Sequence, residues 1–276
     1  MSVRKGVIVA AGYGTRFLPV TRVVPKELLP IVDRPAIDLV VQEFIEAGIT
    51  DLLVITSRRK KALEDWFDRD PELEQALGDD PRIRPPALRV QFARQRKMQG
   101  TGDAILLARE FAGRDPVVVA YPDDLFGQPN PTRALIASFE RTGRSMLAAT
   151  ELEGDVSRYG VLEVAKDGAD LVLKRFVEKP APGTEPSRLV SWGRFVFDSP
   201  LFDALAELRK SHTTGEFFHV GAIEQLARQG RFGVEVITAE RYDTGVPLGY
   251  LKTVIAHALA RPDLGPELRV WLASQR

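Results

Sequence analysis

A glycine-bearing turn near the start of the chain has the composition of a phosphate-binding loop. The apolar run Gly6–Ala11 leads directly into Gly12, Gly14 and then Arg16. Glycines permit close approaches that a side chain would block, and a turn after a buried strand presents free backbone N–H groups to an anion. Arg16 and Lys26 add positive charge, and an arginine fork matches phosphate oxygens. Taken alone, the turn could equally be an ordinary strand-to-helix connection.

Two common phosphate-binding motifs are excluded by the residues that follow this turn. A dinucleotide fingerprint needs a third glycine where Phe17 stands. A P-loop needs Gly-Lys-Ser/Thr, which Gly14-Thr15-Arg16 does not supply. Further along the chain, we interpret the basic run at 58–61 as a solvated face.

Two aspartates, Asp123 and Asp243, each follow a buried strand and lie in a turn. Carboxylates that converge at the edge of a sheet can hold a hard cation such as Mg²⁺, with water and phosphates completing its shell. Taken alone, each aspartate could also be a turn residue or a helix cap. The three histidines have no metal-ligand spacing, so we interpret them as structural.

Alternating strand-like and helix-like segments in the first half of the chain would position these residues. Strands are predicted at 6–11, 51–56, 88–93 and 117–121, and helices at 35–48, at 58–77 with a break at Pro71, and at 101–111. This alternation predicts the α/β class, as a Rossmann-like, doubly wound, mostly parallel sheet. Ligands of such sheets bind beyond the carboxyl ends of the strands, where the glycine turn and Asp123 fall. Asp33 is expected to cap the helix that ends at Gly48.

The second half of the chain is less regular and predicts a smaller mixed β region. Strands are expected at 145–150, 159–164, 171–177, 190–197 and 233–238, with a hairpin at Asp167-Gly168. Helices are expected at 200–209, 215–229 and around 248–259, and a helical tail follows Pro262. No linker, repeat or low-complexity tract interrupts the chain, so we predict a single domain over 1–276.

Composition excludes several classes of function. The 276 residues are 44% hydrophobic, carry 38 Lys+Arg and 38 Asp+Glu, and contain no cysteine. Zero net charge argues against a general nucleic-acid or membrane-surface binder. Without cysteine there can be no disulfide, thiolate nucleophile or Cys-based metal site. No signal-like segment or membrane-length apolar run is present, so we expect a soluble cytoplasmic protein.

The longer string around the glycine turn is far more specific than the turn itself. G-x-G-T-R-F-L-P followed by P-K-E-L-L-P, within 12–30, resembles the nucleotide-entry loop of the sugar-1-phosphate nucleotidyltransferases. Further triplets that resemble motifs of this family are Tyr159-Gly160-Val161, Glu178-Lys179-Pro180 and Asp243-Thr244-Gly245. The resemblance runs from Gly6 to about Leu272. Two segments depart from the family pattern: 78–88 is shorter, and 217–223 reads FFHVGAI where the family has I-Q-L-T-D-A-I, which puts sugar specificity or subunit contacts in doubt.

The resemblance implies a role for each of these residues. Arg16, Lys26 and Lys179 would be the catalytic cations, and Asp123 and Asp243 would bind Mg²⁺. The residues implied in nucleotide binding are Ala10, Ala11, Gly12, Gly14, Thr15, Glu27, Gln95, Gly100 and Asp123. Gln95, five residues before Gly100, offers a donor and an acceptor that match the edge of uracil or thymine. The residues implied in sugar binding are Gly160, Glu178, Lys179 and Gly193, and Trp192 fits either the core or this pocket.

The reaction that the resemblance implies joins a nucleoside triphosphate to a hexose 1-phosphate and releases pyrophosphate. UTP and glucose 1-phosphate are the first choice, with dTTP or an N-acetylhexosamine 1-phosphate as alternatives. A non-catalytic nucleotide-binding regulator of the same fold and an interaction scaffold are the other classes considered. A nucleotide half (about 1–125), a sugar-phosphate half (about 126–260) and a helical tail (about 261–276) are expected. The expected partners are small-molecule substrates, without nucleic acid or membrane, and a second copy of the chain in a homo-oligomer.

Overall fold

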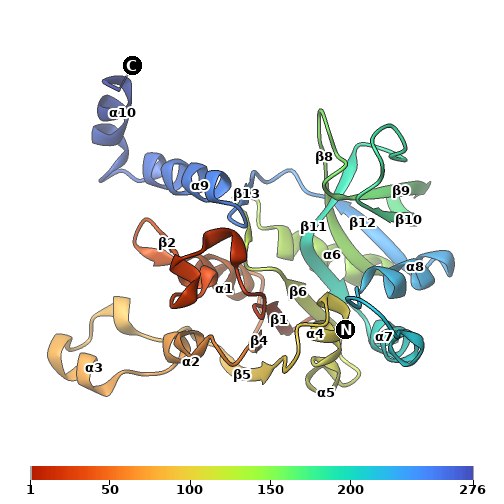
Figure 1. The fold of residues 1–276 in the computed structure, drawn as a ribbon, viewed down its shortest axis with the longest axis horizontal. Helices are drawn as coiled ribbons and strands as arrows, with labels where there is room; N and C mark the ends of the chain where they lie inside the picture. The colour runs from red at the N-terminus through yellow and green to blue at the C-terminus, as the bar shows by residue number, and fades with distance from the viewer. Residues whose placement is uncertain (1, 276) are drawn as a thin grey trace.

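The central sheet joins a parallel part to a closed, mostly antiparallel part. The computed structural model describes residues 2–275, and its largest sheet has nine strands in the order β5-β4-β1-β6-β11-β8-β12-β10-β9. The parallel strands are β1 (Lys5–Val9), β4 (Asp51–Thr56), β5 (Arg89–Arg94) and β6 (Val117–Ala120). Because these four strands run in one direction, their carboxyl ends meet at one edge, in the centre of Figure 1.

The other five strands close into a small barrel. They are β11 (Leu189–Phe197), β8 (Ser145–Glu151), β12 (Phe232–Val236), β10 (Asp170–Glu178) and β9 (Gly160–Asp167). Val190 of β11 pairs with Val161 of β9, which closes the ring. The hairpin predicted at Asp167-Gly168 is confirmed, and Gly168 has φ 64° there. The mixed β region predicted for the second half is therefore a closed barrel continuous with the parallel strands, in which β11 runs antiparallel to β6, β8 and β9.

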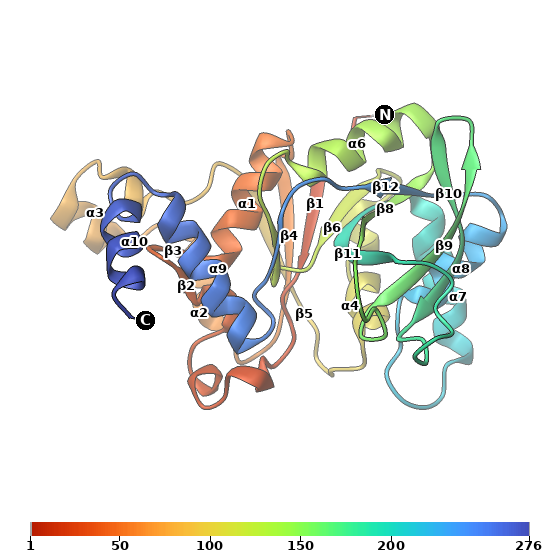
Figure 2. The same ribbon diagram turned by 90° about the horizontal axis from the view of Figure 1, so that it is seen from above.

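Helices cover both faces of the sheet, and successive residues of β1 point to opposite layers. Val7 packs in one hydrophobic cluster with α4 (Thr101–Leu106), α7 (Ser199–Ser211) and α8 (Val220–Arg228). Ile8 packs in the other with α1 (Ala36–Glu46), α2 (Lys61–Phe67) and α6 (Pro131–Thr142). Figure 2 shows the strands between these layers, with α6 above them and α4 below. The two-residue alternation of a strand explains how one apolar run serves both cores.

Short elements surround the carboxyl edge of the parallel strands. The chain between β1 and α1 makes three single-turn helices, η1 (Thr15–Phe17), η2 (Val20–Arg22) and η3 (Lys26–Leu28), and the small pair β2 (Pro30–Ile31) and β3 (Arg34–Pro35). β7 (Asp124–Phe126) pairs antiparallel with β13 (Arg241–Asp243), so that Asp124 lies opposite Asp243. This backbone pairing brings the turns of the two predicted metal ligands together.

The remaining elements lie at the periphery. α5 (Arg109–Ala112) follows α4, while α3 (Pro71–Leu77) and η4 (Pro81–Ile83) follow α2. α9 (Pro247–Ala260) and α10 (Gly265–Ala273) extend from β13 to the upper left of Figure 1. No helix within residues 2–275 is both long enough and apolar enough to cross a bilayer.

Most predicted elements are confirmed to within a few residues, and the exceptions have physical causes. α6 and β7 fall within 122–144, where no element is predicted above. α8 begins at Val220 rather than at 215, because residues before it lie along the loop at 99–102. Asp33 does not cap α1, whose N-cap position is Pro35, and the Asp33 carboxylate pairs with Arg261 instead.

Candidate active site

The predicted phosphate turn opens at the carboxyl end of β1. Gly14 has φ 66°, in the left-handed region that favours glycine. If Gly14 were replaced by a residue with a side chain, its Cβ atom would lie 3.2 Å from a Thr21 carbon and 3.3 Å from a Lys26 carbon. The Thr21 hydroxyl donates to the Gly14 carbonyl at 2.8 Å, which folds the loop onto itself. Gly12 is exposed with no atom near the position of a Cβ, while Ala10 and Ala11 are buried beneath it. Backbone is therefore accessible to a ligand at Gly12.

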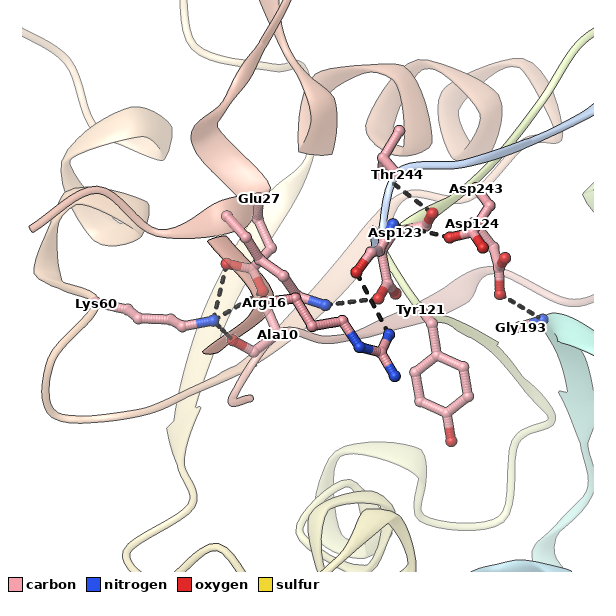
Figure 3. Close-up of polar contacts among 12 residues, drawn as sticks. Ala10, Arg16, Glu27, Lys60, Tyr121, Asp123, Asp124, Gly193, Asp243 and Thr244 are labelled. Carbon is pink, nitrogen blue, oxygen red and sulfur yellow. Dashed lines mark hydrogen bonds and ion pairs between the residues drawn. The ribbon is translucent and has the colours of Figure 1, made fainter. Parts of the chain in front are cut away.

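Lys26 and Arg16 reach from this loop to the two aspartate turns. The Lys26 ammonium lies 2.5 Å from Oδ2 of Asp123. The Arg16 guanidinium donates to the Gly245 carbonyl at 3.3 Å, and Figure 3 shows it directed toward the turn that carries Asp243. The expected meeting of the glycine turn with both aspartates at one edge is thus observed. Thr15, the other predicted nucleotide contact of this loop, is exposed at the start of η1.

The carboxylates of Asp123 and Asp243 face the same point. A Cβ on Gly245 would lie 3.1 Å from Oδ2 of Asp123 and 3.1 Å from Oδ1 of Asp243. The Gly245 N–H donates to that Asp243 oxygen at 2.8 Å, and Thr244 donates to the Asp123 carbonyl from its N–H at 2.8 Å and its hydroxyl at 3.0 Å. Hydrogen bonds thus fix both turns, as Figure 3 shows.

The donor set suits a hard cation that also binds phosphate. Within residues 2–275 no cluster of three or more His, Cys, Asp or Glu residues is arranged to hold a metal. Two carboxylate oxygens alone leave most of an octahedral shell to water and phosphate oxygens, which is how Mg²⁺ is commonly bound beside nucleotides. The residues present therefore fit a divalent cation that arrives with its substrate.

Burial and charge oppose each other at Lys26 and Asp123. Burial would lower the pKa of Lys26, but the carboxylates of Asp123 and Glu27 outweigh it and hold that pKa above its ordinary value. Burial likewise opposes the charge of Asp123, and the Lys26 ammonium keeps the pKa of that carboxyl below its usual range. Both groups are therefore ionised at neutral pH, because the charge of each stabilises the charge of the other.

Asp124 is committed to the protein rather than open to a ligand. Its Oδ1 accepts a hydrogen bond from Nε of Arg241 at 2.9 Å, and its Oδ2 accepts one from the Gly193 N–H at 3.1 Å. The Arg241 guanidinium carbon also lies 3.5 Å from the ring centroid of Trp192, which is buried. A Cβ on Gly193 would lie 2.7 Å from Oδ2 of Asp124, so the approach of β11 to this loop requires glycine.

A buried ion pair supports the glycine loop from beneath. Nζ of Lys60 lies 2.7 and 2.8 Å from the two Glu27 oxygens and 2.6 Å from the Ala10 carbonyl. Burial lowers the pKa of Lys60, and the Glu27 carboxylate partly offsets this effect. The interpretation of 58–61 as a solvated face is wrong for Lys60, which is buried. Both oxygens of Glu27, a predicted nucleotide contact, are occupied by this lysine.

Gln95 and Gly100 meet as the spacing predicts. Nε2 of Gln95 donates to the Gly100 carbonyl at 3.0 Å, although the Gln95 side chain is buried at the mouth of a depression. This open depression of about 930 Å³ is lined by Tyr13, Ser57, Arg58, Arg59, Arg94, Gln95, Arg96 and Met98. The Ser57 hydroxyl is buried there without a hydrogen-bond partner among the described residues. The depression joins the glycine loop to the predicted base-reading residues.

The predicted sugar-binding residues lie at the rim of the barrel. Gly160 pairs with Glu178 across β9 and β10, and a Cβ on Gly160 would lie 3.1 Å from Oε2 of Glu178. Lys179 is exposed, with φ 48° and its ammonium 3.8 Å from Glu178. A left-handed non-glycine residue is uncommon and is typical of functional loops. Among the described residues the Lys179 ammonium forms an ion pair with Glu178 and with neither Asp123 nor Asp243.

A fully buried arginine locks the loop after β6 to α1. The Arg194 side chain is 0% exposed, and its Nε and Nη2 donate to the two Glu43 oxygens at 2.9 and 2.8 Å. Its Nη1 donates to the carbonyls of Tyr121 and Gly193 at 3.1 and 3.0 Å. Because Tyr121 stands two residues before Asp123, this network fixes the start of the aspartate turn.

Three ion pairs that support the site escape sequence reasoning, each for the same reason. Lys60, Arg194 and Arg241 act through partners distant in the chain, at Glu27, Glu43 and Asp124. A single sequence reveals a cation but not the carboxylate that will meet it. Only Arg241 carries a local signal, since it precedes the aspartate turn by two residues.

The sequence as a whole is similar to one enzyme family. The profile of the nucleotidyl transferase family matches residues 5–257. The UTP–glucose-1-phosphate uridylyltransferase of Staphylococcus epidermidis is 36% identical over 281 residues, covering 98% of this chain and 97% of that protein. A second relative, uridylyltransferase 2 of Staphylococcus saprophyticus, is 38% identical over 277 residues, with 96% of each chain covered.

Solved structures of similar proteins superpose over almost the full length. A UTP-bound UDP-glucose pyrophosphorylase from Acinetobacter baumannii has a TM-score of 0.89 at 29% identity, covering 99% of this chain and 100% of that chain. A UDP-glucose pyrophosphorylase in complex with UDP-glucose has a TM-score of 0.83 at 33% identity, covering 94% of this chain and 100% of that chain.

Proposed function

This chain belongs to the nucleotidyl transferase family, and from that premise we propose that it makes UDP-glucose and pyrophosphate from UTP and glucose 1-phosphate. The protein is a UTP–glucose-1-phosphate uridylyltransferase. The full-length similarity to relatives with this activity identifies the reaction. The geometry supplies the single observation that carries its chemistry: Asp123, Asp243 and Lys26 converge beside an open glycine turn.

The reaction is an in-line attack of the sugar phosphate oxygen on the α-phosphorus of UTP. The second pKa of a phosphate monoester is about 6, so the nucleophile is already mostly deprotonated at neutral pH. The enzyme therefore needs no general base and no covalent protein nucleophile. Catalysis depends on positioning and on neutralising the charge of the phosphates.

Cations of this chain supply much of that neutralisation. Arg16 and Lys26, together with the backbone N–H groups of the glycine turn, stabilise the departing pyrophosphate. Lys179 holds the attacking sugar phosphate, which requires its flexible side chain to swing inward from the exposed position it has here. Mg²⁺, when bound through Asp123 and Asp243, supplies further charge to the reacting phosphates.

Specificity comes from the two rims of the site. Gln95 and Gly100 bind the edge of uracil, and the buried Ala10 and Ala11 lie beneath base and ribose. Glu178 accepts hydrogen bonds from sugar hydroxyls, and the backbone at Gly160 and Gly193 borders the sugar. We therefore retain the division into a nucleotide half at about 1–125, a sugar-phosphate half at about 126–260 and a tail at about 261–276.

Self-association is a further part of the proposal, with the enzyme located in the cytoplasm. α9 and α10 expose the large apolar residues Leu248, Leu251, Ile255, Val270 and Trp271. Large apolar residues exposed along two neighbouring helices are typical of a protein interface. Gel filtration of the full chain and of a chain that ends before α10 tests this: a homo-oligomer that becomes monomeric on truncation is expected.

Pyrophosphate release measured with UTP, glucose 1-phosphate and Mg²⁺ tests the activity directly. The same assay with dTTP or N-acetylglucosamine 1-phosphate measures specificity. One methyl group in a pocket is worth about 1–3 kcal/mol, so we expect UTP to exceed dTTP in kcat/KM by about tenfold or more. A protein that binds UTP with full occupancy and releases no pyrophosphate with any sugar phosphate would be a regulator, and the proposed activity would be abandoned.

A further inference from the structure

The segment that departs most from the family pattern lies against the nucleotide side of the site. Residues between α7 and α8 contact the loop at 99–102 through the backbone of Phe217. The Phe217 N–H donates to the Gln99 carbonyl at 2.6 Å, and the Gly102 N–H donates to the Phe217 carbonyl at 2.9 Å. A Cβ on Gly100 would lie 2.4 Å from the Phe217 carbonyl oxygen. Backbone contacts this close make the shape of the base-reading loop depend on the segment at 217–223.

One side chain of this segment fastens that loop directly. Nδ1 of His219 lies 2.8 Å from the hydroxyl of Thr101, the residue after Gly100. His219 is 7% exposed, and its ring packs edge-on against Tyr121 and Phe195 with centroids 6.1 and 5.3 Å away. Its Nε2 has no hydrogen-bond partner among the described residues. The Thr101 hydroxyl is therefore the only polar contact of this ring within 2–275.

Movement of Thr101 would displace Gly100, its covalent neighbour, and the hydrogen bond between Gly100 and Gln95 would carry this displacement to the base. Gln95 donates from Nε2 to the Gly100 carbonyl, and this bond decides which way its amide faces. With one amide N–H used in this way, Oε1 and the second N–H remain to pair with the acceptor and donor of uracil. A displaced Gly100 would therefore turn the Gln95 amide away from the base.

We propose that His219 is a positioning residue for the nucleotide, holding Thr101 so that Gly100 and the Gln95 amide are set for uracil. This inference rests on the proposed function, because it assigns the base to Gln95. It also implies that the altered segment at 217–223 affects binding of the nucleotide, rather than specificity for the sugar. His219 touches neither substrate in this account and acts only through Thr101.

Three substitutions separate the hydrogen bond from simple packing. In His219→Asn the side-chain amide occupies the position of Nδ1 and can still meet Thr101, whereas His219→Leu fills the space without a polar atom. Thr101→Val removes the hydroxyl and keeps the branched shape. We expect H219L and T101V to raise the KM for UTP about fivefold, as the loss of one hydrogen bond predicts, with kcat and the KM for glucose 1-phosphate changed less than twofold. H219N is expected to stay within twofold of the unchanged enzyme.

The double variant T101V/H219L tests whether the two residues act through one contact. If they do, the double variant raises the KM for UTP no more than either single change. Thr142→Val serves as the matched control, because the Thr142 hydroxyl donates to the Ser138 carbonyl at 2.7 Å within α6, on the other face of the sheet. We expect T142V to leave both KM values unchanged.

Calorimetric binding of UTP keeps this test independent of turnover. H219L and T101V should weaken UTP binding by the same factor as they raise its KM, and thermal unfolding checks that each variant is folded. If pyrophosphate release were absent in the unchanged protein, the proposed activity would fail while the binding comparison still tested His219. Equal defects in H219N and H219L, additive effects in the double variant, or a raised KM for the sugar alone would each overturn the inference.

Discussion

At the scale of single residues, the ion pair between Lys26 and Asp123 explains how the site rests without substrate. The Asp123 oxygen that faces Asp243 is the one that Lys26 contacts. Removal of the charged partner from a partly buried pair is costly, so the lysine stabilises a carboxylate that would otherwise be unpaired. A cation and the phosphates of UTP would take over both partners, Asp123 and Lys26. The pair is thus a resting arrangement of two groups needed separately in catalysis.

Lys26→Met should separate these two roles. We expect kcat to fall roughly a hundred- to a thousandfold, by analogy with other removed electrostatic donors. Without substrate, Mg²⁺ should raise the melting temperature of K26M more than that of the unchanged protein, because no ammonium competes for Asp123. Pyrophosphate release and thermal scans with and without Mg²⁺ measure both effects. Lys61→Met, an exposed lysine of α2, is the control, and equal Mg²⁺ shifts in all three proteins would contradict the resting arrangement.

His219 makes folding sensitive to acid. Burial lowers its pKa from an ordinary 6.5 to about 4, so the folded state disfavours the proton that the unfolded chain accepts. Stability is therefore lost as pH falls from 6.5 toward 4, by about 2 kcal/mol at pH 5. Urea unfolding at pH 7 and pH 5 measures this loss, which should be about 2 kcal/mol smaller in H219N. An equal loss in both proteins would show that His219 is not the acid-sensitive group.

At the scale of elements, the buried pair Arg194–Glu43 joins β11 to α1 behind the aspartate turn. Arg194→Met would leave the Glu43 carboxylate buried and unpaired, so we expect a loss of about 3–5 kcal/mol in the free energy of unfolding. The double variant R194M/E43Q should recover part of the lost free energy of unfolding. The denaturant midpoint measures both, and Lys210→Met, which breaks a pair with Glu207 that is 72% exposed on both sides, should change stability by less than about 1 kcal/mol. If R194M also lost less than about 1 kcal/mol, the Arg194–Glu43 pair would have no structural role.

Elements with a strong local signal could be predicted from the sequence, and elements defined by distant partners could not. The apolar runs of β1, β4 and β6 and the three-and-four spacing of α1 are local patterns, and all four are confirmed. β7 and β13 are three residues each and exist only because they pair with each other across more than a hundred residues. The direction of β11 is likewise set by its neighbours β6 and β8, so periodicity could not reveal that the sheet turns antiparallel.

The residues of the candidate site likewise include some that local patterns predict and others that depend on distant partners. The glycine turn and Asp123 could be placed together because strand ends share one edge of a parallel sheet, whereas Asp243 reaches them through the pairing of β13 with β7. Lys60 could not be separated from its basic run, because burial depends on Glu27 lying above it. The role of the segment at 217–223 also required the fold, since only the backbone contacts of Phe217 reveal which substrate it adjoins.

At the scale of the whole molecule, charge is balanced in total but not in distribution. Lys+Arg and Asp+Glu are equal at 38 each. Three arginines of the depression beside Gln95, at positions 58, 59 and 96, are exposed and form no ion pair within residues 2–275. Unpaired cations gathered at the mouth of a site raise the local concentration of an anionic substrate. A molecule with no net charge can therefore still attract UTP to one edge of its sheet.

Replacing these three arginines by alanine should slow the capture of UTP without impairing chemistry. We expect kcat/KM for UTP to fall about tenfold at low salt, with kcat nearly unchanged, because steering acts before binding. Salt screens such attraction, so the difference from the unchanged enzyme should shrink as ionic strength rises. Alanine at Arg4, Arg114 and Arg231 removes the same charge from the amino ends of β1, β6 and β12, and should have little effect. Equal losses in both triple variants, or a difference that persists at high salt, would mean that net charge or direct contact, rather than the placement of these arginines, governs how UTP is captured.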